Sequence, residues 1–218
     1  MNRNLLRTSR RAAVVLTGAG LLVAMTAGPS SAATDLCISV NGTVRVQMGT
    51  AKCSSVAGAG NVAIARGANS SATAGVAAGD THNQARATGA NSLAFTGDGS
   101  GNTATATATG SFAAAALGDG NTATTTGIDA GATAEGTNQT AIASGDRSSA
   151  VVRFGENSIA TASGDESFAN ANGGNHNIAT ASAFRSQALA VTGDNNTAIA
   201  STPNCIAEAT GGGATDSC

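Results

Sequence analysis

Between residues 58 and 201 the chain repeats about every 19 residues, and alanine marks the interval most clearly. Successive alanines of one set keep this interval, with one step, from Ala123 to Ala141, shorter by a single residue, and a second set follows the first after nine residues each time. A disordered low-complexity segment has no reason to keep such a register, so the spacing predicts an ordered repeat fold. The two sets are Ala85, Ala104, Ala123, Ala141, Ala160, Ala179 and Ala198, and Ala94, Ala113, Ala132, Ala150, Ala169 and Ala188.

An earlier pair of alanines, Ala63 and Ala72, has the same nine-residue offset, but its step to Ala85 and Ala94 is three residues longer than the usual one. The longer step predicts an insertion of three residues near positions 76–80. The register of the repeat is therefore expected to continue on both sides of this insertion.

Each half of the repeat has about five residues in which Ala alternates with Thr, Ile or Val, and about four residues rich in Gly, Asp and Asn. Alternation at period two is typical of a β-strand, and Gly and Asn accept the positive φ angles that tight corners need. Two short strands and two corners in every repeat predict an all-β protein, a parallel β-solenoid. Its coils are expected to stack about 4.8 Å apart, in roughly seven turns.

The alternation leaves open which face of the strands is the core. An alanine core would require two sheets that approach closely, and the other face, which mixes Thr with Ile142, Ile159, Ile178 and Ile199, is the alternative core. Asparagines also recur near the start of one strand and are expected to stack as a hydrogen-bonded ladder. They are Asn102, Asn121, Asn157, Asn177 and Asn196.

All four cysteines lie outside the repeats, with Cys37 and Cys53 before them and Cys205 and Cys218 after them. An even number of cysteines in an exported chain predicts disulfides, and we expect the local pairs Cys37–Cys53 and Cys205–Cys218. The expected organisation is an N-terminal disulfide cap over 34–57, solenoid repeats over 58–201 and a C-terminal disulfide cap over 202–218. Metal ligation is the alternative, although the spacings contain no C-x-x-C pair.

Residues 1–33 have the pattern of a secretory signal peptide, because Arg3, Arg7, Arg10 and Arg11 precede an apolar stretch and a run of small residues. Four of the 11 basic residues are removed with this segment, so seven bases face 13 acids and the mature net charge is −6. Without a basic patch, neither a nucleic acid nor an anionic membrane is an expected partner, and no membrane insertion is expected after signal removal. The predicted location is extracellular or loosely associated with the cell envelope.

No catalytic, cofactor-binding or metal-binding residues are predicted, and the chain is not expected to be an enzyme. The two histidines, His82 and His176, lie in Gly- and Asn-rich corners, and the Gly-rich segment 97–101 lacks the lysine of a phosphate-binding loop. Nine-residue half-turns are also typical of calcium-binding β-rolls, which remain an alternative. The ligand positions of that motif hold Asn here, and the corner acids are expected to be solvated turn acids or to form Asx-turns. These acids are Asp98, Asp119, Asp146, Asp165 and Asp194.

The repeats resemble the head repeats of trimeric autotransporter adhesins, on the segments Asn61-Val62-Ala63-Ile64-Ala65 and Gly67-Ala68-Asn69-Ser70-Ser71-Ala72. The resemblance covers roughly residues 58–201 and implies a β-solenoid head, a homotrimer, and binding to surfaces or matrix proteins. The repeat of this chain is longer than that of the adhesins. Overall the chain also resembles uncharacterised secreted proteins of high-GC actinobacteria.

The function expected from these features is a secreted structural or adhesive surface protein that presents a solenoid face to a protein, to the cell envelope or to its own copies. Ice binding is an alternative, because two neighbouring turns carry dense threonines. The equivalent positions along the stretch Ala141–Ala198 hold Ile, Gln and Ser, so the regular array of threonines is expected to end before this stretch. The threonines are Thr103, Thr105, Thr107, Thr109, Thr122, Thr124 and Thr126.

Overall fold

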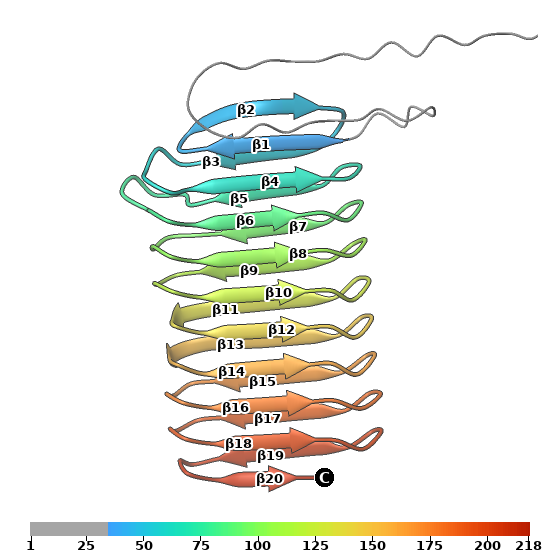
Figure 1. The fold of residues 1–218 in the computed structure, drawn as a ribbon. Helices are drawn as coiled ribbons and strands as arrows, with labels where there is room; N and C mark the ends of the chain where they lie inside the picture. Colours follow the sequence, from blue (N-terminus) through green and yellow to red (C-terminus); the bar gives the residue numbers. More distant parts are fainter. Residues whose placement is uncertain (1–34) are drawn as a thin grey trace, which may run out of the picture. The chain divides into compact units, whose positions relative to one another are not determined.

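The structure is a computed structural model that describes residues 35–218, and the predicted signal peptide 1–33 lies outside this part of the chain. The described residues fold as a parallel β-solenoid made of two facing sheets (Figure 1). The 11-stranded sheet, here sheet A, contains in spatial order β2 (Thr43–Met48), β1 (Leu36–Val40), β4 (Val62–Arg66), β6 (Gln84–Ala87), β8 (Thr103–Ala106), β10 (Thr122–Thr125), β12 (Thr140–Ala143), β14 (Ile159–Ala162), β16 (Ile178–Ala181), β18 (Thr197–Ala200) and β20 (Thr215–Ser217). The 9-stranded sheet, sheet B, contains β19 (Ile206–Thr210), β17 (Gln187–Val191), β15 (Phe168–Asn172), β13 (Ser149–Glu156), β11 (Gly131–Thr137), β9 (Phe112–Ala116), β7 (Leu93–Thr96), β5 (Ser71–Ala74) and β3 (Lys52–Ser55). Within these residues no helix has the length and hydropathy needed to cross a membrane.

The predicted solenoid and its register are confirmed, but the stack is longer than expected. Consecutive strands of each sheet pair in parallel with alanine opposite alanine, as in Ala123 opposite Ala141. Sheet B has nine strands, so the solenoid has about nine turns rather than seven. The alanine count misses the first strand, where Cys53 takes the alanine position opposite Ala72, and the last strand, where Ala207 lies opposite Ala188 beyond the predicted end of the repeats.

Alanine forms the core, and the alternative with isoleucine inside is wrong. The paired alanines of both sheets are fully buried, whereas Ile159, Ile178 and Ile199 are each about two-fifths exposed on the opposite face. The Cα atoms of Cys37 and Cys53, which come from the two sheets, lie 5.5 Å apart. Two sheets that pack through larger side chains lie about 10 Å apart, so the space between these sheets suits methyl groups, and Thr96, Thr125 and Val152 are the larger side chains buried at alanine positions.

A continuous ladder of polar side chains runs along one corner of the core. The side-chain oxygen of each member accepts the backbone N–H of the next member, as from Asn102 to Asn121 at 2.9 Å. Its side-chain amide, where it has one, donates to a corner carbonyl, as from Asn102 to Gly118 at 2.8 Å, except at Asn177, whose amide nitrogen has no partner within residues 35–218. We call it the asparagine column. Its buried members are Asn61, Asn83, Asn102, Asn121, Gln139, Ser158, Asn177 and Asn196.

The predicted ladder is thus confirmed except at Asn157. This residue has φ 55° and lies in the corner itself, while its neighbour Ser158 occupies the column. Asparagine accepts the left-handed conformation more readily than most other residues, so it occurs at left-handed corner positions as well as in the column. The sequence pattern alone does not distinguish these two positions.

The opposite corner carries a second column of small residues, here the serine column. All serines of the column except Ser167 donate their hydroxyl to the carbonyl three residues earlier in the same turn, as from Ser92 to Gly89 at 2.6 Å. The residue before the serine has positive φ, as at Asn91 with 54°. The column consists of Ala51, Ser70, Ser92, Ser111, Ala130, Ser148, Ser167, Ser186 and Cys205.

The two ends of the solenoid are closed differently, and both predicted disulfides are present. At the N-terminal end β1 and β2 form an antiparallel hairpin, and β1 also pairs antiparallel with β4. Strand β1 therefore runs opposite to both of its neighbours in sheet A. At the C-terminal end Asp216 takes an alanine position, opposite Ala198, and accepts the backbone N–H of Glu208 in sheet B at 2.7 Å. An inward-pointing charge is one way in which proteins discourage further strand addition at a sheet edge.

The predicted insertion lies in the corner between β5 and β6, which Figure 1 shows as a wider loop. Asp80 closes this loop by accepting the backbone N–H groups of Val76 and Ala77, and it also accepts the N–H of Gly99 in the next turn. Burial alone would raise the pKa of the Asp80 carboxyl, but these three backbone donors outweigh burial and hold its pKa below the ordinary value.

Candidate functional site

The outward face of sheet A is uniform over six consecutive strands, from β8 to β18. Each of these strands has two outward positions within the strand, and every one holds threonine or isoleucine. A third outward position, just after each strand, holds an exposed threonine or serine. We call this surface the threonine–isoleucine face. It consists of Thr103, Thr105, Thr107, Thr122, Thr124, Thr126, Thr140, Ile142, Ser144, Ile159, Thr161, Ser163, Ile178, Thr180, Ser182, Thr197, Ile199 and Ser201.

The face is flat and repeats in two directions. Its strands pair in parallel with no shift of register, so each outward side chain lies directly beside its equivalent in the next turn. Equivalent side chains therefore repeat about every 4.8 Å along the solenoid and about every 6.6 Å along a strand. The six strands and three positions give a surface of roughly 24 Å by 13 Å.

The side chains of the face are held in fixed orientations. Threonine and isoleucine are branched at Cβ, which restricts χ1 strongly, and neighbours on both sides of each column restrict it further. Most of the threonines are half-buried, so their hydroxyl and methyl groups reach solvent from a surface without long flexible side chains.

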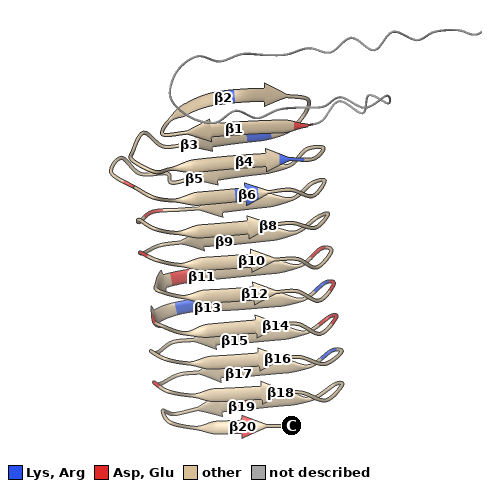
Figure 2. Cartoon of the chain, in the orientation of Figure 1, with Lys and Arg blue, Asp and Glu red and all other residues tan. Residues whose placement is uncertain are grey.

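No charged residue lies on the face. Figure 2 shows the charged residues between β8 and β18 at the corners of the solenoid and on sheet B. The outward surface of the sheet A strands from β8 to β18 carries none of them. Glu166 in one corner is bridged by Arg147 and Arg185, each at 2.6 Å, and these side chains lie along the edge of the solenoid.

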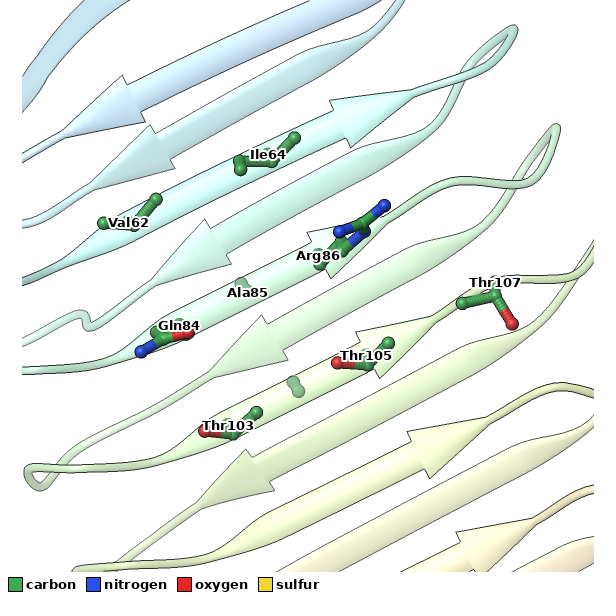
Figure 3. Close-up of a pocket in the computed structure, with 9 residues that line it drawn as sticks. Val62, Ile64, Gln84, Ala85, Arg86, Thr103, Thr105 and Thr107 are labelled. Carbon is green, nitrogen blue, oxygen red and sulfur yellow. The ribbon is translucent and has the colours of Figure 1, made fainter. Parts of the chain in front are cut away.

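The face ends at β6, where the outward residues change character. A shallow groove runs there over β4, β6 and β8, and Figure 3 shows Gln84 and Arg86 lying along β6 beside the threonines of β8. Val62 and Ile64 line its other side. A groove with one arginine and one amide over an open sheet lacks the enclosure typical of a small-molecule site.

Sheet B has the same core and register but a varied outward face. Its strands present aromatic residues such as Phe95 and Phe112 on β7 and β9, and then an ion pair of 3.2 Å between Glu135 and Arg153 on β11 and β13. The solenoid therefore tolerates many outward side chains. The uniformity of sheet A is not required by the fold.

Four of the five corner acids, all except Asp98, accept backbone hydrogen bonds from a neighbouring turn through their carboxylates, in addition to facing solvent. Asp119, Asp165 and Asp194 each accept a backbone N–H from the preceding turn, at distances of 2.7–3.0 Å. Asp146 does the same for Ile128 at 2.8 Å. These acids therefore tie neighbouring turns together.

The two histidines occupy equivalent corner positions, each with φ 58°. Gly101, Gly120 and Asn138 are among the residues between them in the same column, so His82 and His176 do not meet. Across residues 35–218 no group of three or more His, Cys, Asp or Glu side chains is arranged to hold a metal ion.

Reasoning from the sequence misses the extent of the threonine–isoleucine face. The expected break after two turns depends partly on glutamine, but Gln139 is buried in the asparagine column and Gln187 belongs to sheet B. Thr109, counted as an outward threonine, lies in a corner. Aligning the residues that flank each alanine of sheet A would have found the face. No family model, curated protein or solved structure matches this chain.

Proposed function

We propose that this protein is a secreted, non-catalytic adhesive or structural protein that binds an extended partner surface through the threonine–isoleucine face. The observation that carries the proposal is the contrast between the two sheets. Sheet A keeps one small set of side chains over six strands, whereas sheet B, on the same core, does not. A uniform surface without an enclosed pocket fits attachment to an extended partner better than chemistry on a small molecule.

Other features support a role outside the cell. Two disulfides indicate an oxidising compartment, since such bonds are rare in reducing cytosol. The resemblance of the repeats to adhesin heads points in the same direction, toward contact with the cell envelope or a protein. It also implies a homotrimer, which the solution mass of the exported protein tests directly.

A pair of matched variants tests the binding face. Thr124 and Thr133 are both half-buried, outward-facing residues of central strands, the first on sheet A and the second on sheet B. Thr124→Arg introduces a long charged side chain into the proposed face, and Thr133→Arg makes the same change on the opposite sheet. We expect Thr124→Arg to reduce co-sedimentation with cell-envelope fragments of the producing organism, or with ice crystals, and Thr133→Arg to leave both unchanged. Equal behaviour of the two variants contradicts the proposal.

A further inference from the structure

We infer that the partner surface is ice. This inference rests on the proposed function and names the chemistry of the partner that the threonine–isoleucine face fits. Three properties of the face carry it, namely its charge, its side-chain types and its repetition.

The charge of the face excludes partners recognised by ion pairing. Nucleic acids and anionic lipid surfaces are bound largely through Lys and Arg, and the face has neither. All the members of the face are neutral at every pH at which the protein is folded. A matching partner surface must therefore be neutral as well.

The side-chain types argue against a folded protein as partner. Protein interfaces take most of their affinity from a few aromatic or arginine residues that fill pockets in the partner. The face has no aromatic residue and no arginine, and its largest side chains are four isoleucines spread over four strands: Ile142, Ile159, Ile178 and Ile199. Such a surface has no anchor, and all its contacts are small and alike.

Repetition is the positive part of the argument. The face presents hydroxyl and methyl groups at two fixed spacings, and its strands are held in register by backbone pairing on both sides. Water beside such a surface meets a hydroxyl partner at regular intervals, with methyl groups between that restrict its orientation. A crystal of water is a neutral surface that repeats in two directions and offers a hydrogen-bonding group at every site. The surface of a globular protein without internal repeats offers no matching period over the length of six turns.

The rigidity of the face strengthens the inference. A surface of long side chains would lose conformational freedom when it became ordered against a lattice, and this loss opposes binding. Threonine and isoleucine on this face are already restricted, so little further ordering is needed. Many weak and equal contacts can then add up over the whole surface.

The decisive experiment measures ice binding by the exported, oxidised protein and by three variants. Thr124→Arg and Thr161→Arg place a charge on the face in β10 and β14, and Thr133→Arg is the matched change on sheet B. The readouts are thermal hysteresis and partition into a slowly growing ice front. Circular dichroism of each variant verifies that the fold is retained.

We expect the wild type and Thr133→Arg to show hysteresis and to enrich in the ice, and the two face variants to lose both properties. A folded wild type that is excluded from ice like an inert protein overturns the inference. If that protein still co-sediments with envelope fragments and Thr124→Arg weakens this, the proposed function stands without ice. If Thr124→Arg and Thr133→Arg behave alike in both assays, the face is not the binding surface and both proposals fail. A stable oligomer in which the face is buried between copies also overturns the ice inference.

Discussion

The two corners of this solenoid hold their turns together in different ways. The asparagine column forms hydrogen bonds from one turn to the next, as where Asn121 accepts the backbone N–H of Gln139 at 3.0 Å. The serine column forms its side-chain bonds within a turn, as where the Ser111 hydroxyl donates to the Ala108 carbonyl at 2.7 Å. The buried side chains of the asparagine column therefore couple turns, whereas the buried serines bond within their own turn and leave the coupling of that corner to its backbone and to exposed side chains such as Asp146 and Asp165.

The residues found at each corner follow this difference. Every member of the asparagine column has a side-chain oxygen, including the exceptions Gln139 and Ser158. The serine column includes Ala51, Ala130 and Cys205, which cannot make the serine bond. Losing a bond within a turn affects one corner, whereas losing a bond between turns leaves buried backbone groups of two turns without partners.

The comparison is tested most strongly by Asn121→Ala. The change leaves the buried N–H of Gln139 and the carbonyl of Gly136 without their side-chain partners. Each buried unsatisfied group costs about 1–3 kcal/mol, so we expect a loss of about 2–4 kcal/mol in the free energy of unfolding. Urea unfolding gives the value, and Asn121→Gln, which matches the native Gln139, is the control with the smaller loss. A loss below about 1 kcal/mol for the alanine variant would remove the distinction between the corners.

The second test uses the serine column at the C-terminal end. Replacing Cys205 and Cys218 together by serine removes the disulfide but places the usual residue of the column at position 205. A loop of this length is stabilised by about 3 kcal/mol when it is closed, and we expect a loss of about 2–3 kcal/mol that falls mainly on β19 and β20. Hydrogen exchange should show faster exchange of the last turn first. Unchanged exchange there would mean that the disulfide does not hold the end of the stack.

A third prediction concerns pH and the enlarged corner held by Asp80. Its folded pKa is lowered, so the ionised carboxylate contributes stability above the ordinary pKa of 3.8, and this contribution is lost as the pH falls through the folded pKa. We expect Asp80→Asn to lose about 1–2 kcal/mol at neutral pH, because charged hydrogen bonds to backbone donors are replaced by weaker ones. Thermal unfolding from pH 7 down to pH 2 should show the two proteins converging in acid. A difference that stays constant with pH would contradict the role of the charge.

Ser111→Ala is expected to have a smaller effect, with a loss of about 0.5–1 kcal/mol. The hydroxyl bond to Ala108 is lost, but the methyl group fits, as Ala130 shows one turn later. Measured beside Asn121→Ala under the same conditions, this variant gives the ratio between the two corners. Equal losses would mean that both columns couple turns.

The smallest effect is expected at the charged edge of the serine corner. The hydrogen bond and charge of Arg185, together with the charge of Arg147, hold the pKa of Glu166 below its ordinary value. We expect Arg185→Gln to raise the pKa of Glu166 toward that value, with little change in melting temperature, because these side chains are exposed and screened by salt. Titration followed by NMR reports the shift. A pKa unaffected by Arg185→Gln would show that the ion pair is not formed in solution.

Most of the fold was predictable because one short repeat determines it. The alanine register alone located the strands, the turns and the insertion near Asp80, and the cysteine positions gave both disulfides. The choice of core was not predictable, because Ile159 and Ala160 alternate on the same strand and either face could have been inside. The decision depends on how closely two sheets approach, which is a property of the whole stack rather than of any one strand.

The candidate surface was harder to predict than the fold. By residue type, Gln139 resembled an interruption of the outward threonines, and Asn157 resembled a member of the asparagine ladder. Alignment by residue type ignores whether a position lies in a corner or on a strand. The shift of one residue between Asn157 and Ser158 separates a left-handed corner residue from a buried column member. The sequence pattern also does not show which of the two sheets a threonine belongs to. That assignment requires the three-dimensional arrangement of strands within each turn.

The exact repetition of parallel pairing has a consequence for how such a chain changes over generations. Each turn contacts only the turn before and the turn after it, so duplication or loss of one whole turn would create the same contacts that already exist. The turn that is one residue short, between Ala123 and Ala141, and the turn enlarged by three residues near Asp80 show that the corners absorb small errors of length. The area of the threonine–isoleucine face can therefore be gained or lost in steps of one turn, without redesign of the core. Variants that differ by whole turns would show how binding strength depends on the area of that face.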